Sequence, residues 1–162
     1  MASPEPVDYH GLTPDVLLDA VEYCGYRTDG RFLALNSYEN RVYQVGVEDA
    51  NPVIAKFYRP LRWSNEAILE EHEFACALAQ QDIPVVAPEI IKGTSLHTHA
   101  GYRFALYPRQ GGHWPELNTL EQREWMGRFI ARLHLVGASR PFAHRPALDV
   151  ESFGKRSYRY LL

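Results

Sequence analysis

A lysine in the middle of an apolar strand constrains this chain more than any other feature. Lys56 lies within Val53–Tyr58, which follows two β-prone runs, Phe32–Leu35 and Val42–Val47, separated by polar residues 36–40. Such runs around a short polar turn predict a hairpin with a third strand beside it. Because lysine is depleted in strands and rarely buried without a partner, its position needs a reason. An anion lying over the sheet would supply one.

Two interpretations of this unit are open from the residues alone. In the first, residues 36–40 form an ordinary hairpin loop, and Lys56 lies on an edge strand with its stem buried and its ammonium group in water. In the second, the turn is a lid whose backbone N–H groups face phosphate oxygens, and Lys56 supplies a point charge to them. Ser37 and the two asparagines of the turn suit such a lid. Glu39 would repel a triphosphate unless it turned to solvent or paired with Arg41.

The helix predicted from Ser64 to about Gln81 carries a carboxylate on its apolar side. The apolar residues of this segment gather on one side at helical spacing, and Glu71 falls near the middle of that side. A carboxylate there is costly unless a cation meets it. We therefore expect an ion pair between Lys56 and Glu71. The alternative is a slightly rotated helix in which Glu71 belongs to an acidic surface.

The rest of the sequence predicts an α+β chain with about five antiparallel strands and a helix inserted after the third strand. We expect a helix from Thr13 to Gly25, another opened by the capping box Thr119–Gln122, strands near Glu89–Ile91 and at Tyr102–Tyr107, and a loop over residues 92–100. His97 and His99 in this loop have no acidic or cysteine neighbour, so they give little indication of a metal site. Residues 107–112 would form a cleft edge where free backbone groups could meet a planar base.

Composition and charge restrict the partners of the chain. It has 162 residues, of which 46% are hydrophobic, enough to bury a real core. With 17 Lys and Arg against 20 Asp and Glu, no basic field invites nucleic acid or acidic lipid. No apolar stretch is long enough to span a bilayer, and residues 1–10 lack the features of a signal peptide. Cys24 and Cys76 lie in amphipathic segments, which favours buried thiols and a cytoplasmic protein.

The order of these elements resembles the N-terminal lobe of the protein-kinase-like fold. Several sequence words are similar to those of the stress response kinase A family, bacterial Ser/Thr protein kinases related to aminoglycoside phosphotransferases and choline kinases. They are LNSYENRVYQ at residues 35–44, KFYRP at 56–60, RW at 62–63, ILEEHEFACAL at 68–78, FALYPRQGG at 104–112, GRFIARLH at 127–134 and HRPALDV at 144–150. The resemblance extends from about Leu12 to the end of the chain.

This resemblance implies a role for each residue of the predicted site. Ser37, Tyr38, Glu39 and Asn40 would cover the phosphates of ATP; Lys56 would hold the α- and β-phosphates, oriented by Glu71; and Tyr107 with the residues just after it would offer backbone hydrogen bonds to adenine. It also implies three regions. Residues 1–29 would be an N-terminal extension with a helix, 30–112 the ATP-facing lobe, and 113–162 a linker and the first helix of a helical C-terminal lobe.

The sequence lacks the residues that phosphoryl transfer itself requires. Families of this kind supply a His-Gly-Asp segment, with an Asn soon after it, and an Asp-x-Asp segment, which orient the acceptor and bind Mg²⁺; neither segment is present. In His144–Pro146, proline stands where the aspartate of a catalytic loop would be, so we interpret these residues as a structural turn. We expect no catalytic residue and no metal ligand within this chain, and no phosphate transfer by it alone.

Three classes of function are open from the sequence. The first is part of a Ser/Thr protein kinase that transfers the γ-phosphate of ATP to a protein substrate, with Mg²⁺ bound outside this chain. The second is part of a small-molecule kinase of the aminoglycoside, choline or homoserine type, and the third is a non-catalytic binding module. In each case we expect an apolar face, lined by parts of Tyr107–Trp114 and the helix from Leu120, to promote self-association.

Overall fold

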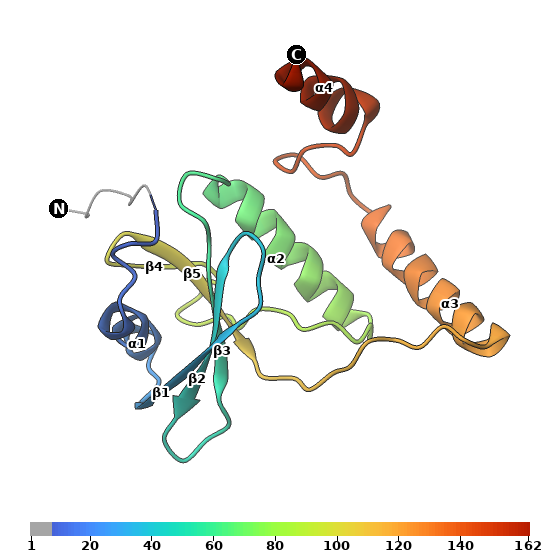
Figure 1. Cartoon of the computed structure of the whole chain (residues 1–162). Helices are drawn as coiled ribbons and strands as arrows, with labels where there is room; N and C mark the ends of the chain where they lie inside the picture. The colour runs from blue at the N-terminus through green and yellow to red at the C-terminus, as the bar shows by residue number, and fades with distance from the viewer. Residues whose placement is uncertain (1–7) are drawn as a thin grey trace.

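A five-stranded antiparallel sheet is the central element of the chain, which a computed structural model describes over residues 8–162 (Figure 1). The strands are β1 (Thr28–Leu35), β2 (Arg41–Val47), β3 (Val53–Phe57), β4 (His97–His99) and β5 (Tyr102–Pro108). The helices are α1 (Pro14–Tyr23), α2 (Asn65–Gln80), α3 (Leu120–Gly137), the π-helical turn η1 (Glu151–Lys155) and α4 (Arg156–Leu161). The strand order is β1-β2-β3-β5-β4, so β3 lies at the centre of the sheet.

The central position of β3 bears on the edge-strand interpretation of its lysine. Lys56 is paired with Val42 of β2 on one side and with Ala105 of β5 on the other. The interpretation of Lys56 as an edge-strand residue is therefore wrong, because both neighbouring positions of its backbone are occupied by strands. Its ammonium group has to leave the sheet from a face.

The two faces of the sheet are covered by different helices, as the alternation of side chains along a strand requires. Phe104 and Leu106 of β5 point to the side of α1, where Leu17 and Val21 join them in one buried cluster. Their neighbour Ala105 points to the other side, where it lies in a second cluster with residues of α2. Figure 1 shows α1 and α2 on opposite sides of the sheet. Lys56, opposite Ala105, belongs to the face of α2.

Both helix starts expected around the sheet are confirmed. The Thr13 side chain accepts a hydrogen bond from the backbone N–H of Val16 at the start of α1, and Ser64 accepts one from Ala67 at the start of α2. Gly25 follows α1 with a φ of 101°, the left-handed conformation that lets glycine end a helix. The cap therefore fixes where α2 begins, and with it which residues face the sheet.

The fourth strand differs from its sequence prediction. Residues 89–91 form no strand: Ile91 makes only an isolated bridge with Thr94, although the Glu89 N–H donates to the Leu106 carbonyl. The chain turns back at Lys92 and Gly93, whose φ angles are 53° and 80°, before a ladder can form. The strand that pairs with β5 on the side away from β3 is instead β4, within the predicted loop over residues 92–100.

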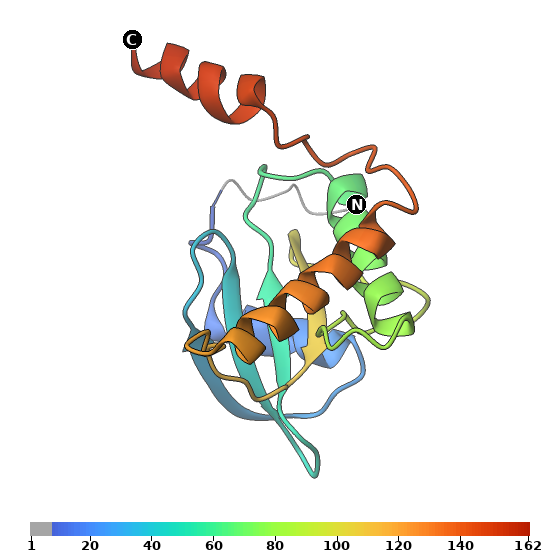
Figure 2. The ribbon, with the colours of Figure 1, turned by 90° about the vertical axis from the view of Figure 1, so that its right-hand side faces the viewer.

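The last third of the chain lies beside α2 and then leaves it. Helix α3 begins at the expected capping box of Thr119 and Gln122, and none of its residues is buried. Figures 1 and 2 show α3 alongside α2, and η1 with α4 projecting away from the sheet. Among the helices of residues 8–162, none combines the length and the apolar character needed to cross a membrane.

Candidate nucleotide-binding site

The predicted ion pair between β3 and α2 is confirmed. The Nζ atom of Lys56 lies 2.9 Å from Oε1 of Glu71. The ammonium group also lies 4.8 Å from the centre of the Tyr58 ring, within the range of a cation–π contact. The alternative of a rotated helix is wrong, since the Glu71 carboxylate points to the sheet. Lysine and glutamate are 22% and 33% exposed, so the pair lies at a surface that a ligand can reach.

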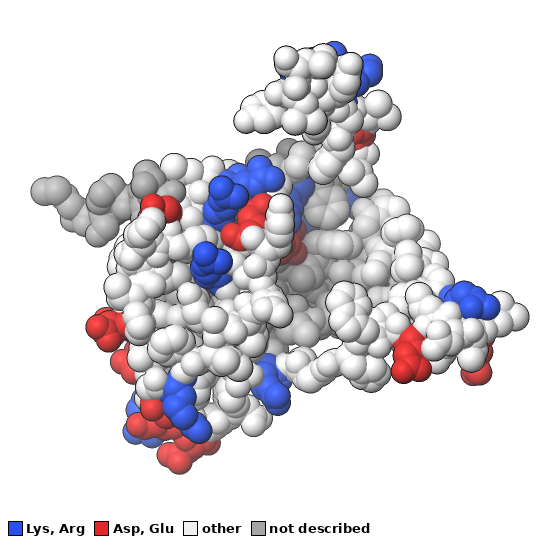
Figure 3. Space-filling model, viewed as in Figure 1, with Lys and Arg blue, Asp and Glu red and all other residues white. Residues whose placement is uncertain are grey.

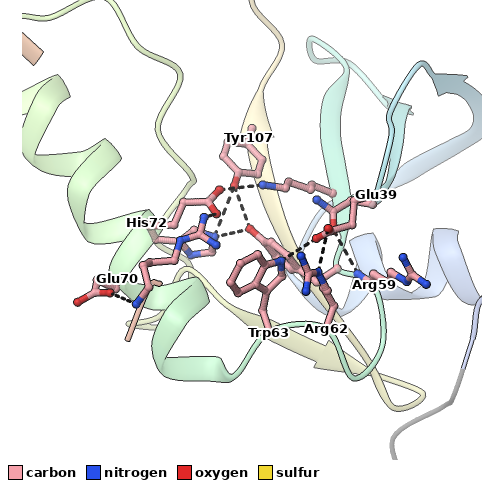
Figure 4. A network of polar contacts seen from close by, with 12 residues as sticks. Glu39, Arg59, Arg62, Trp63, Glu70, His72 and Tyr107 are labelled. Atoms are coloured by element: carbon pink, nitrogen blue, oxygen red, sulfur yellow. Dashed lines mark hydrogen bonds and ion pairs between the residues drawn. The ribbon is translucent and has the colours of Figure 1, made fainter. Parts of the chain in front are cut away.

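A buried polar chain supports the pair from behind. His72, the next residue of α2, has Nδ1 2.8 Å from the Ser95 hydroxyl and Nε2 2.5 Å from the Tyr58 hydroxyl. The hydroxyl groups of Tyr58 and Tyr107 are 3.2 Å apart (Figure 4). Burial lowers the pKa of His72 to about 4 and raises the pKa of Tyr107 to about 12, so both side chains are neutral at pH 7. These bonds fix the Tyr58 ring beneath Lys56.

The turn between β1 and β2 is held by its own hydrogen bonds. The Ser37 hydroxyl donates to the backbone carbonyl of Asn40, and the Asn40 side-chain oxygen accepts the backbone N–H of Arg59 at 3.2 Å. The Tyr9 hydroxyl, from the segment before α1, contacts the carbonyl of Glu39 at 3.4 Å. Tyr38 points fully into solvent. Residues 36–40 therefore form a short polar flap, anchored at its second half.

The carboxylate of Glu39 neither turns to solvent nor pairs with Arg41, the two alternatives that the sequence left open. It accepts hydrogen bonds from Nε1 of Trp63 at 2.6 Å and from Nε of Arg62 at 3.1 Å (Figure 4), whereas Arg41 lies over the Tyr9 ring. Burial acts to raise the pKa of Glu39, but these two hydrogen bonds outweigh it and hold the pKa below its ordinary value. The Glu39 carboxylate, which carries the negative charge of the flap, is thus held by Arg62 and Trp63.

A cavity of about 380 Å³ lies beside the ion pair, on the face of the sheet covered by α2. It is lined by Val42, Ile54, Lys56, Glu71, His72, Ala75, Val86, Pro88, Tyr107, Pro108 and Gln110. One end therefore carries the charges of Lys56 and Glu71, and the remainder is mostly apolar, as a site for a planar ring with an anionic tail requires. Figure 3 shows the molecule hollowed between the sheet and the helices, with basic and acidic side chains gathered beside the hollow.

Tyr107 lines this cavity with its side chain. Along an antiparallel strand the backbone groups of successive residues point to opposite sides. The Leu106 carbonyl points away from β3, because it accepts the N–H of Glu89, so the backbone of Tyr107 faces its partner Ile54 on β3. Further along the chain, the backbone groups at the cavity edge belong to Pro108 and Gln110, which also line the cavity. Tyr107 is thus better placed to contact a ligand through its ring than through its backbone.

Sequence reasoning missed Arg145 and Trp63. The Arg145 guanidinium forms an ion pair with Oε2 of Glu71 and lies 4.6 Å from the centre of the Trp63 ring. Residues 71 and 145 are 74 positions apart, and no periodicity connects them. One signal in the sequence pointed to Trp63. It follows Arg59 and Arg62, and an indole N–H needs an acceptor when it is partly buried.

Residues 8–162 contain no group of three or more His, Cys, Asp or Glu side chains that could hold a metal ion. His97 points its Nε2 atom into the protein interior without a hydrogen-bond partner among these residues, and His99 lies against the Tyr23 ring. The donor set described here does not fit a divalent-cation site, and we assign no metal ligand to it.

Comparison with known proteins identifies the family of the chain. A profile of the phosphotransferase enzyme family matches residues 31–158, most of the chain. The chain belongs to this family. The matched residues include the flap, Lys56, Glu71 and the cavity edge at Pro108.

Several curated relatives carry kinase names. The chain is 42% identical over 145 residues to stress response kinase A of Salmonella choleraesuis and 41% identical to that of Escherichia coli strain K12. It is also 41% identical to the serine/threonine protein kinase RdoA of Salmonella typhimurium. In each case the match covers 90% of this chain and 44% of the relative. The chain therefore spans less than half the length of these relatives.

A solved structure shares the fold. The chain is similar to the amicoumacin kinase hAmiN in complex with AMP-PNP, Ca²⁺ and Ami, with a TM-score of 0.63 at 18% sequence identity. The match covers 88% of this chain and 44% of that one. The α+β architecture with a five-stranded antiparallel sheet is thus that of a kinase-like fold, as the order of elements predicted.

Proposed function

We propose that this chain is the ATP-binding part of a Ser/Thr protein kinase. The observation that carries the proposal is the Lys56–Glu71 pair at the charged end of a mostly apolar cavity. A lysine in the central strand, steadied by a helix carboxylate, is a device for holding phosphate oxygens. Membership in the phosphotransferase enzyme family supports the same conclusion.

Each part of the cavity has a task in this proposal. The adenine ring lies between the apolar side chains of Val42, Ile54 and Tyr107, and the backbone of Pro108 and Gln110 supplies its hydrogen bonds. Lys56 holds the α- and β-phosphates as a point charge, because its ammonium group keeps donors that Glu71 does not use.

The flap of residues 36–40 covers the phosphates. Its backbone N–H groups and the Ser37 hydroxyl are the donors in this proposal. Since that hydroxyl donates to the Asn40 carbonyl in the free chain, it has to exchange this acceptor for a phosphate oxygen. Glu39 stays paired with Arg62 and Trp63, which keeps its charge from the nucleotide. Tyr38 is then left at the solvent side of the flap.

The acceptor of the phosphate is a protein Ser or Thr hydroxyl in the longer protein. The names of the curated relatives, stress response kinase and serine/threonine protein kinase, favour this acceptor and a role in bacterial stress response. The structural neighbour favours the alternative, since it is named for a small molecule, amicoumacin. We prefer the protein acceptor because the relatives are about 42% identical and the neighbour 18%.

Residues 1–162 alone transfer no phosphate in this proposal, because the sequence holds neither the His-Gly-Asp nor the Asp-x-Asp segment. The acceptor carboxylate and the Mg²⁺ ligands then belong to residues outside this chain. We further propose a cytoplasmic location, which suits the free thiols of Cys24 and Cys76.

Titration of the chain with ATP, followed by calorimetry, tests the nucleotide site. We expect saturable binding that Lys56→Ala weakens by about tenfold or more, since a charge-assisted contact to phosphate is lost. Lys92→Ala is the matched control, because Lys92 contacts Tyr23 outside the cavity. Absence of saturable binding, or equal affinity of the two variants, would contradict the proposal.

A phosphate-transfer assay with radiolabelled ATP tests the proposed inactivity of the 162 residues and the proposed protein acceptor of the longer protein. The 162 residues should label no substrate, whereas the longer protein should label a protein substrate in preference to choline or an aminoglycoside. Transfer by the 162 residues that Lys56→Ala abolishes would refute their proposed inactivity.

A further inference from the structure

The segment between α3 and η1 returns to α2 and is fixed there by the carboxylates of that helix. Glu70 accepts the backbone N–H groups of three consecutive residues, Ala143, His144 and Arg145. A carboxylate that accepts several backbone N–H groups is a rigid anchor, because each bond is charge-assisted. This anchor gives the segment a defined position on the helix turn that carries Glu71.

Two further contacts strengthen the attachment. Arg140 forms an ion pair with Glu73 at 2.7 Å, one helical turn from Glu70. The Phe142 ring packs edge-on against Phe74 with 5.3 Å between ring centres. Residues 140–145 thus lie along α2 as a clamp, held at both ends by side chains of that helix.

The clamp directs Arg145 to the turn of α2 that carries Glu71. Its guanidinium pairs with Oε2 of Glu71, while Lys56 pairs with Oε1 of the same carboxylate. The guanidinium also lies over the Trp63 ring, and its side chain is only 26% exposed. An arginine held by a carboxylate and an aromatic face at once loses most of its rotational freedom.

This arrangement has two physical consequences for Glu71. With a cation on each oxygen, the carboxylate cannot rotate away from Lys56 without breaking the contact with Arg145. In addition, the side chains that meet at Glu71 carry two positive charges and one negative charge, whereas Lys56 and Glu71 alone would be neutral. A net positive charge favours an anionic ligand at the charged end of the cavity.

We propose that Arg145 is a positioning residue, which fixes Glu71 against Lys56 and keeps the phosphate end of the cavity positive. This inference rests on the proposed nucleotide site, and it assigns a task to a segment that carries no acid or base of its own. Arg145 acts through Glu71, at the end of the clamp formed by residues 140–145.

The first arm of the test measures ADP affinity by calorimetry in the 162-residue chain. Arg145→Ala should weaken ADP binding by about fivefold and reduce the salt dependence of the affinity, because a positive charge near the phosphates is lost. Arg145→Lys should recover most of the loss, since it restores the charge. Arg27→Ala, which removes an exposed arginine that pairs with Glu48, should bind ADP as the unsubstituted chain does.

The second arm needs no nucleotide. A double-mutant cycle of Glu71→Gln and Arg145→Ala, measured by chemical unfolding, should show non-additivity of at least about threefold in the unfolding equilibrium constant. Additivity would overturn the inference, as would unchanged ADP affinity in a folded Arg145→Ala variant or a loss that Arg145→Lys does not reduce. Failure of the unsubstituted chain to bind ADP would instead refute the nucleotide site, and the cycle would then decide whether Arg145 positions Glu71.

Discussion

Lys56 and Glu71 are 15 residues apart in the sequence, and their side chains meet at 2.9 Å across the interface of β3 and α2. The lysine has one carboxylate partner, whereas the glutamate has two cations, Lys56 and Arg145. The pair is therefore asymmetric, and removing one member should not cost the same free energy of unfolding as removing the other.

We predict that Glu71→Gln destabilises the chain more than Lys56→Met. The first substitution leaves the two cations Lys56 and Arg145 without a negative charge between them and should cost about 2 kcal/mol. The second leaves Glu71 paired with Arg145 and should cost less than about 1 kcal/mol. Chemical denaturation of both variants measures the difference, with Glu73→Gln on the exposed side of α2 as the control. Equal losses in the free energy of unfolding would mean that the contact between Arg145 and Glu71 does not stabilise the chain.

The stability of the chain should fall as the pH falls below about 6.5, because of His72. Its pKa is 6.5 in the unfolded chain and about 4 in the folded one, since burial disfavours the charged form. Between these values the unfolded state binds the extra proton, so the free energy of unfolding decreases as pH decreases, and the loss ends near pH 4. The full effect is no more than about 3 kcal/mol.

His72→Gln provides the comparison for this pH dependence. The groups that face His72 include Tyr58 and Tyr107 from the sheet, Ser95 from the loop before β4, and Glu71 from its own helix. Neither the two tyrosines nor the serine titrate between pH 4 and 6.5. Urea unfolding at several pH values should show a shallower slope for the glutamine variant. An identical slope would show that other carboxylates or histidines cause the acid sensitivity.

Trp63→Phe should loosen the flap while leaving the core intact. The indole N–H donates to Glu39 at 2.6 Å, and phenylalanine keeps the ring between Arg62 and Arg145 without that donor. We expect a loss of about 1 kcal/mol in the free energy of unfolding, and faster cleavage by chymotrypsin after the exposed Tyr38. Trp125→Phe on the exposed surface of α3 is the control. Unchanged cleavage would show that Trp63 does not hold the flap.

The part of this site that the sequence predicted depends on local patterns. Helical spacing placed Glu71 on the apolar side of α2, and the β-prone run placed Lys56 within a strand, so their meeting followed from one helix facing one sheet. The strand β4 escaped prediction because its three residues, His-Thr-His, are too few to show the alternating pattern that indicates a strand. Its place is set by pairing with β5, which is a property of the tertiary structure.

The partners of charged side chains were harder to predict than their positions. Glu39 was expected to turn to solvent or to pair with Arg41, but Arg41 lies over the Tyr9 ring. The actual partner of Glu39, Arg62, arrives from the connection between β3 and α2. Arg145 arrives from still further along the chain, so neither contact has a signal in the local sequence.

The exposed apolar side chains of α3 and the preceding linker should make the chain self-associate. Trp114, Leu120, Trp125, Ile130 and Leu135 are all exposed, in a part of the chain where α3 buries none of its residues. Apolar surface of this kind gains free energy when a second surface covers it. Light scattering over a range of concentrations should therefore show a mass that increases with concentration. Trp125→Ser with Ile130→Ser should reduce the increase, whereas Leu33→Ser on β1, also exposed, should not. A constant monomer mass up to high concentration would show that this surface does not bind a second copy.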